Sequence, residues 1–212
     1  MLLKILAILL FVVLLALVLV IVALFPWFKL NQQVNKLDKQ GNYSAAIPLA
    51  QKAVELARQT RGNQNAMLGT SLNILANLYS SQGRYSEAEP LYNEALEIDR
   101  IALPQNHPSL ARDLNNLALL YYSQGRYAEA EHLYNEALEI DRIALPESHP
   151  QLATHLNNLA ELYRSQGRYS EAEAFYNEAI SIVRKALPEN HPDLACVLNN
   201  LAELYRSQSR YS

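Results

Sequence analysis

The chain begins with an unbroken apolar segment and continues with segments in which apolar and polar positions are mixed. Residues 5–25 are 21 consecutive apolar side chains, with Lys4 before them and Lys29 shortly after. As a helix at about 1.5 Å per residue, this segment would span about 32 Å, the thickness of the hydrocarbon core of a bilayer. The pattern predicts a single transmembrane helix and a membrane anchor over residues 1–29, with the lipid bilayer contacted by residues 5–25.

A cleaved signal peptide is the alternative for these residues. Its apolar region would span about 7 to 15 residues and would end at a small-x-small site, but Ala23 has no small residue two positions away. Trp27 and Phe28 suit the aromatic belt at a membrane interface. More lysines follow the segment than precede it, which favours a single-pass membrane protein with its C-terminal domain in the cytoplasm.

From residue 30 onward, apolar residues recur at the spacing i, i+3, i+4, i+7, which is typical of one face of an α-helix. Leu114, Leu117, Ala118 and Tyr121 show this spacing, and the whole pattern returns every 42 residues. Of the 13 tyrosines, 12 fall on three positions of the repeat. A fixed period of this length is typical of repeat architectures. The alternation that marks strands is absent, so the sequence predicts an all-α protein.

Each unit of the repeat reads as two helices. His107 and Pro108 suit the start of the first helix, and Gly125 in the "QGRY" motif suits its end. The second helix follows from Tyr127, and Pro146 closes the unit. The predicted array covers residues 30–212, divided into repeats at about 30–65, 66–107, 108–149, 150–191 and a truncated repeat at 192–212.

The unit resembles the tetratricopeptide repeat at Leu114, Leu117, Ala118, Tyr121, Ala130 and Tyr134. Its 42-residue length, with LNNLA, LYxxQGRYxEAExLY and a terminal HP, resembles the kinesin light chain variety. The resemblance implies a right-handed α-solenoid of helical hairpins whose first helices line a concave groove. Together with the predicted anchor, it implies a membrane-anchored scaffold that binds a protein or peptide partner and has no enzymatic activity.

The motif LNNLA places two asparagines in the first helix of three repeats. The second asparagine of each pair points almost opposite to the core face, into the predicted groove, together with Arg112. These second asparagines are Asn116, Asn158 and Asn200, and Ile74 stands at the same position one repeat earlier. The first asparagines flank the core face and suit either the groove or helix stacking: Asn73, Asn115, Asn157 and Asn199. The resemblance implies that groove asparagines bind the main chain of a peptide.

The remaining polar residues do not indicate catalysis or a cofactor. The net charge of -3 is spread along the chain, without the basic face that nucleic-acid binding requires. His107, His149 and His191 are equivalent loop positions, too far apart to share a metal ion. His132 and His155 are expected to be exposed, and the repeated "EAE" triplets to form a solvated helix face. We therefore expect no metal, no cofactor and no small-molecule substrate.

An alternative function comes from the last predicted helix. A terminal repeat should have a polar outer face, whereas Leu201, Leu204 and Tyr205 keep the ordinary core pattern. This suggests that the natural chain continues, and that the array is the accessory or sensor portion of a larger effector enzyme.

Overall fold

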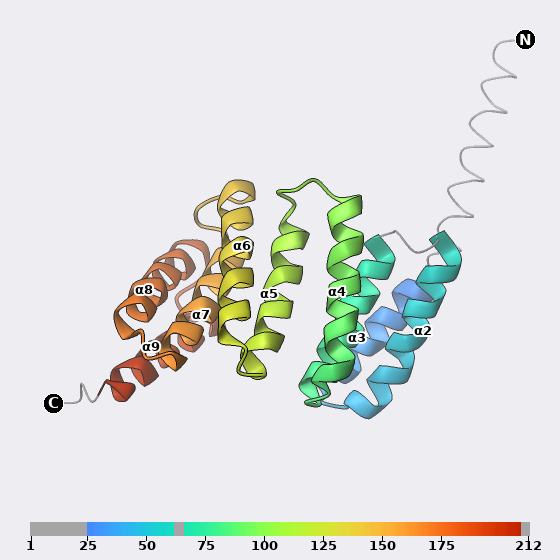
Figure 1. The fold of residues 1–212 in the computed structure, drawn as a ribbon, viewed down its shortest axis with the longest axis horizontal. Helices are drawn as coiled ribbons and strands as arrows, with labels where there is room; N and C mark the ends of the chain where they lie inside the picture. Colours follow the sequence, from blue (N-terminus) through green and yellow to red (C-terminus); the bar gives the residue numbers. More distant parts are fainter. Residues whose placement is uncertain (1–24, 62–65, 209–212) are drawn as a thin grey trace, which may run out of the picture.

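The computed structural model describes residues 25–61 and 66–208, and in these two ranges the chain is helical throughout apart from short turns (Figure 1). Residues 25–39 form the first helix, and eight further helices follow: α2 (Tyr43–Arg61), α3 (Ala66–Ser81), α4 (Tyr85–Ala102), α5 (Pro108–Ser123), α6 (Tyr127–Ala144), α7 (Pro150–Ser165), α8 (Tyr169–Ala186) and α9 (Pro192–Ser207). The all-α prediction and the two-helix unit are confirmed for the described residues.

The predicted membrane helix lies outside the described residues, except for Phe25 at its end. Over residues 25–61 and 66–208, no helix combines the length and the apolar character that a bilayer crossing needs. The division of the chain at residues 1–29 and 30–212 therefore stays a prediction.

The helix ends are set by the residues that the sequence predicts for them. The ring Nδ1 of His107 accepts a hydrogen bond from the backbone N–H of Ser109 at 3.2 Å, and Pro108 occupies the first turn of α5. His149 and His191 cap α7 and α9 in the same way. Gly125 ends α5 in the left-handed conformation with φ of 75°, which disfavours any side chain with a Cβ.

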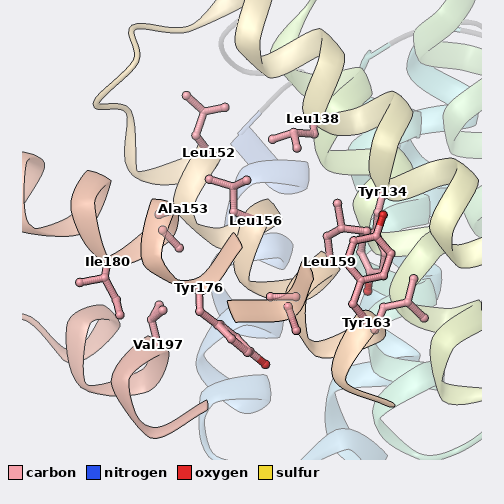
Figure 2. Close-up of a cluster of buried hydrophobic side chains, with 14 of the residues drawn as sticks. Tyr134, Leu138, Leu152, Ala153, Leu156, Leu159, Tyr163, Tyr176, Ile180 and Val197 are labelled. Atoms are coloured by element: carbon pink, nitrogen blue, oxygen red, sulfur yellow. The ribbon is translucent and has the colours of Figure 1, made fainter. Parts of the chain in front are cut away.

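Leucine, alanine and tyrosine side chains fill the space between the helices. In the cluster around α6, α7 and α8, Tyr134 and Tyr176 are fully buried next to Leu156 and Leu159 (Figure 2). Ala118 and Ala130 are fully buried where α5 and α6 pack together, and a small side chain there lets the two helices approach closely. The predicted core face is confirmed.

The packing forms a helical solenoid in which each hairpin stacks on the next (Figure 1). The first helices of successive repeats contact each other directly, α3 with α5, α5 with α7 and α7 with α9, while α4, α6 and α8 approach one another less closely. The array therefore bends towards the side of its first helices. The right-handed sense of the superhelix stays a prediction.

Arginines of the "QGRY" motif bind consecutive repeats together. The Arg126 guanidinium lies 3.7 Å from the ring centroid of Tyr121, and it also pairs with Glu129 at 2.5 Å and with Glu89 of the preceding repeat at 2.8 Å. Arg168 repeats this arrangement, with Glu131 of the preceding repeat at 2.7 Å. The second glutamate of the "EAE" triplet thus joins two repeats, which corrects its interpretation as part of a solvated face.

Candidate peptide-binding groove

The predicted groove stripe lies on the accessible side of the first helices. Arg112, Leu119 and Ser123 of α5 are exposed, and Asn116 between them is half-buried. Thr154 and Ser165 are exposed on α7. Leu119 is 45% exposed although it belongs to a helix whose opposite face is fully buried. The first helices therefore present a continuous polar and partly apolar surface along the array.

Two hydrogen bonds between asparagines connect successive repeats in this surface. The Asn158 side-chain amide donates from Nδ2 to Asn115 Oδ1 at 3.0 Å. Asn200 makes the same bond to Asn157 Oδ1, at 2.9 Å. The two positions of LNNLA thus act together, because the second asparagine of one repeat binds the first asparagine of the repeat before it.

The asparagines at the two ends of the series are placed differently. Asn73 is buried, and its Nδ2 donates to Asp113 Oδ1 at 2.9 Å and to the carbonyl of Gly69 at 3.3 Å. Within the described part of the chain the side-chain amide of Asn116 makes no hydrogen bond, and neither does that of Asn199, which is exposed on α9. The structure therefore joins four of the seven asparagines in two pairs and leaves the side-chain amides of Asn116 and Asn199 unpaired among the described residues.

Each asparagine bond leaves part of the amide unused. A side-chain amide has two N–H donors and one carbonyl acceptor, and Asn158 and Asn200 each use only one N–H. The remaining N–H and carbonyl of each amide can bind a ligand without breaking the bond to the neighbouring repeat. The interaction also fixes the side-chain rotamers, which reduces the entropy lost when a ligand binds.

A cavity of about 210 Å³ opens beside these asparagines, between α7 and α9. Asn157 and Asn158 line it on one helix, with Cys196 and Val197 on the other. Two larger cavities, of about 450 and 490 Å³, lie away from the asparagines and are lined mainly by the second helices and the loops that follow them. The cavity next to the asparagines is thus a small mixed pocket that suits one side chain of a bound peptide.

Charged and phenolic groups continue the surface along α7. Glu161 Oε2 accepts hydrogen bonds from Tyr176 Oη at 2.8 Å and from Arg164 Nε at 3.0 Å, and Tyr122 Oη lies 2.9 Å from Ser165 Oγ. Burial raises the pKa of Glu161, but the hydrogen bonds from Arg164 and Tyr176 outweigh it and the net pKa is lowered. Glu161 is therefore a paired carboxylate at neutral pH.

One histidine prediction is wrong. His155 is 3% exposed, and its Nδ1 lies 2.8 Å from Asp141 Oδ2, so it belongs to the packed junction between α6 and α7. His132 is exposed, as expected. The sequence carried a signal for the buried histidine, because Asp141 falls on the core face of its helix, where a carboxylate needs a polar partner. No group of three or more metal-binding side chains occurs among the residues that the structure describes.

Comparisons with known proteins agree with this architecture. A tetratricopeptide repeat family model matches residues 37–101, 105–143, 114–185 and 151–212. The chain belongs to the tetratricopeptide repeat family. No curated protein sequence matches this tetratricopeptide repeat chain.

Two solved structures share the fold of this tetratricopeptide repeat protein. One is a Podosopora anserina protein of the kinesin light chain type with nearly identical TPR-like repeats, similar over 87% of this chain and 89% of that chain, with a TM-score of 0.72 and 24% identity. The other is BtubC (BKLC) from P. vanneervenii, similar over 85% of this chain and 72% of that chain, with a TM-score of 0.73 and 28% identity. The array therefore has kinesin light chain-like structural neighbours and a scaffold suited to protein–protein interaction.

Proposed function

We propose that the concave surface of this tetratricopeptide repeat array binds an extended peptide segment of a protein partner, without enzymatic activity. The observation that carries the proposal is the row of asparagines that continues from repeat to repeat, with unused N–H and carbonyl groups on Asn116, Asn158 and Asn200. An extended peptide offers backbone N–H and C=O groups at regular intervals, which amide side chains can bind whatever the peptide sequence.

Selectivity for particular peptides would come from the neighbouring side chains. Arg112 is exposed on one side of the asparagines, and the cavity of about 210 Å³ beside Asn158 accepts one small apolar or polar side chain. Arg112 would pair with an acidic residue of the peptide. The proposed ligand is therefore a peptide with one acidic residue and one residue small enough for the cavity.

The experiment is the capture of peptides from a library by the wild-type chain and by a triple variant with Asn116, Asn158 and Asn200 changed to Ala. Loss of several amide contacts at about 1 kcal/mol each should weaken binding at least about tenfold. Because Asn158 and Asn200 also join repeats, the thermal unfolding midpoint of the variant is measured in parallel. Asn93→Ala on the exposed side of α4 is the matched control.

Two results are informative about this proposal. Weakened capture by a variant that still unfolds cooperatively, with unchanged capture by the control, supports binding through the asparagines. Equal capture by the wild-type chain and the triple variant would contradict it.

We further propose that residues 1–29 anchor the array to a membrane as a single-pass helix, with the repeats in the cytoplasm. The support is the apolar segment of 21 residues at positions 5–25 and the excess of lysines after it. The anchored chain should resist extraction from membranes at alkaline pH, and a chain without residues 1–29 should be released. Release of both would refute the anchor.

A further inference from the structure

Two buried positions recur at the junctions between consecutive repeats, one near the end of a second helix and one in the first helix 14 residues later. The pairs are Ala57 with Ser71, Asp99 with Asp113, Asp141 with His155, and Val183 with Val197. All eight residues are buried, with exposed fractions between 0% and 4%. The outer two junctions carry uncharged residues, whereas the two in the middle of the array carry ionisable ones.

The junction between α4 and α5 brings two carboxyl groups together. Asp99 is 3% exposed and Asp113 is 1% exposed, and both carboxyls face the same turn of α3, that of Asp99 beside Gly69 and that of Asp113 beside Asn73, so that the Asp99 carboxyl raises the pKa of Asp113. Asp113 Oδ1 accepts from Asn73 Nδ2 at 2.9 Å and from the Arg112 guanidinium at 3.3 Å. Asp99 Oδ1 and Asp113 Oδ2 are buried and have no donor among the described residues.

Gly69 on α3 lies against the carboxyl of Asp99. A Cβ at this position would lie 2.7 Å from Asp99 Oδ1, closer than a carbon and an oxygen can approach without a shift. The equivalent residues Ala111 and Ala153 in later repeats are buried alanines. The backbone of α3 thus makes room for the Asp99 carboxyl at this junction.

The charges around the pair are too few to balance two carboxylates. Arg112 on α5 is the cation that faces Asp113, and its side chain is 48% exposed, which weakens its effect through solvent screening. The α3 side contributes the uncharged Asn73, and the titratable groups of α6 and α7, Asp141 and His155, belong to the next junction. Two buried carboxylates in contact would repel strongly, and both free oxygens would lack a donor.

We propose that Asp99 and Asp113 share one proton in the buried junction between the second and third repeats, and that loss of this proton as the pH rises to neutral and above loosens the array at this junction until the loss is complete. The shared proton supplies the missing donor, because the O–H of one carboxyl donates to the free oxygen of the other. This inference is independent of what the groove binds.

The direction of the pH effect follows from Asp113. Burial, opposed by Arg112 and reinforced by Asp99, raises the pKa of Asp113 from 3.8 to about 7. The folded chain therefore holds a proton that the unfolded chain releases between about pH 4 and pH 7. The free energy of unfolding falls as the pH rises through this window and then levels off. Within the window, the equilibrium constant for opening increases by up to about tenfold per pH unit.

The neighbouring junction does not need a shared proton. Asp141 Oδ1 accepts a hydrogen bond from Gln151 Nε2 at 2.9 Å, and His155 Nδ1 stands 2.8 Å from Asp141 Oδ2. A histidine ring nitrogen that carries a proton can donate to the carboxylate without a second acid. Val183 and Val197 make the last junction apolar, which provides an internal reference within the same molecule.

The experiment is amide hydrogen exchange of the full chain in a mild detergent at pH 5.5 and pH 8, corrected for intrinsic rates. Wild-type α4 and α5 should lose protection at pH 8 by at least tenfold more than α8 and α9. Asp113→Asn and Asp99→Asn each keep a polar side chain of the same shape and remove one charge, so the pH-dependent loss should disappear. The carbon-13 shift of the Asp113 carboxyl in the wild-type chain gives a second measurement that needs no variant.

The possible outcomes separate the alternatives. An Asp113 carboxyl that titrates near neutral pH, together with loss of protection confined to α4 and α5, supports the proposal. Equal pH dependence at both junctions, or titration of both carboxyls near pH 4, would overturn it.

Discussion

At the residue scale, identical sequence positions take different roles because of a single neighbour. Asn115 and Asn157 accept hydrogen bonds from the following repeat, whereas Asn73 at the equivalent position donates to Asp113 instead. The change follows from Asp113, which stands where the later repeats have His155 and Val197. A charged acceptor attracts an amide N–H more strongly than a neutral one.

Gly69 offers a residue-scale prediction. A glycine inside a helix is normally improved by alanine, by about 1 kcal/mol. Here the added Cβ would lie 2.7 Å from Asp99 Oδ1. Gly69→Ala should therefore fail to stabilise the wild-type chain, and should stabilise the Asp99→Ala variant by about 1 kcal/mol. Urea unfolding of the four chains of this cycle measures the difference, and equal effects of Gly69→Ala in both backgrounds would show that Asp99 does not limit this position.

At the element scale, the helix boundaries depend on local residues and the junctions depend on pairs of helices. The His-Pro caps of α5, α7 and α9 and the glycines that follow α3, α5 and α7 recur at equivalent positions and need no tertiary contact. The arginines of the "QGRY" motifs, by contrast, bind a glutamate of the preceding repeat where that repeat has one. Arg126 has Glu89, while the position that would serve Arg84 is Ile47.

The junction between α6 and α7 gives the element-scale prediction. His155→Val leaves the buried Asp141 carboxylate with Gln151 as its remaining donor, and should lower the free energy of unfolding by about 3 kcal/mol. The double variant with Asp141→Val and His155→Val reproduces the Val183 and Val197 pair of the next junction and should recover that loss. Chemical unfolding of the single and double variants tests both statements, and a double variant no more stable than the single one would contradict the argument.

At the scale of the whole molecule, the array is a line of hairpins in which each hairpin contacts its neighbours (Figure 1). Its free energy of unfolding is therefore close to the sum of the contributions of the individual repeats and of the junctions between them, and it depends on which repeats are neighbours. Three partly exposed ion pairs join successive second helices at equivalent positions of the repeat. They are Arg58 with Glu94, Arg100 with Glu136, and Arg142 with Glu178. They lie on the wider side of the bent array, where only long side chains can reach from one second helix to the next.

Deletion of one repeat tests this description. Removal of residues 108–149 joins α4 to α7, so that Asp99 faces His155 as Asp141 does in the parent chain. The same splice sets Asn158 one repeat after Asn73, as it stands after Asn115 in the parent chain. We expect this shorter chain to fold cooperatively. Its free energy of unfolding should be lower by no more than the contribution of one repeat and one junction.

The matched deletion removes residues 150–191 and joins α6 to α9. Asp141 then faces Val197, which cannot donate a hydrogen bond. This chain has the same length as the first deletion but should be less stable by about 3 kcal/mol, because it buries an unpaired carboxylate. Thermal and urea unfolding followed by circular dichroism compare the two chains, and equal stability would show that the junction pair does not matter.

The sequence by itself determined the repeat, its two helices, their caps and the face of each helix that is buried. These features follow from residues close together in the chain, such as Leu114 with Leu117 or His107 with Pro108, and their spacing is legible without a structure. The tertiary structure decided which side chains meet across repeats. The pairs Asn115 with Asn158, Asp141 with His155, and Asp99 with Asp113 join separate helices, and the stacking of one hairpin on the next brings them together. His155 was for this reason expected at the surface, since helical spacing describes a residue's own helix and not the carboxylate that a neighbouring helix presents to it.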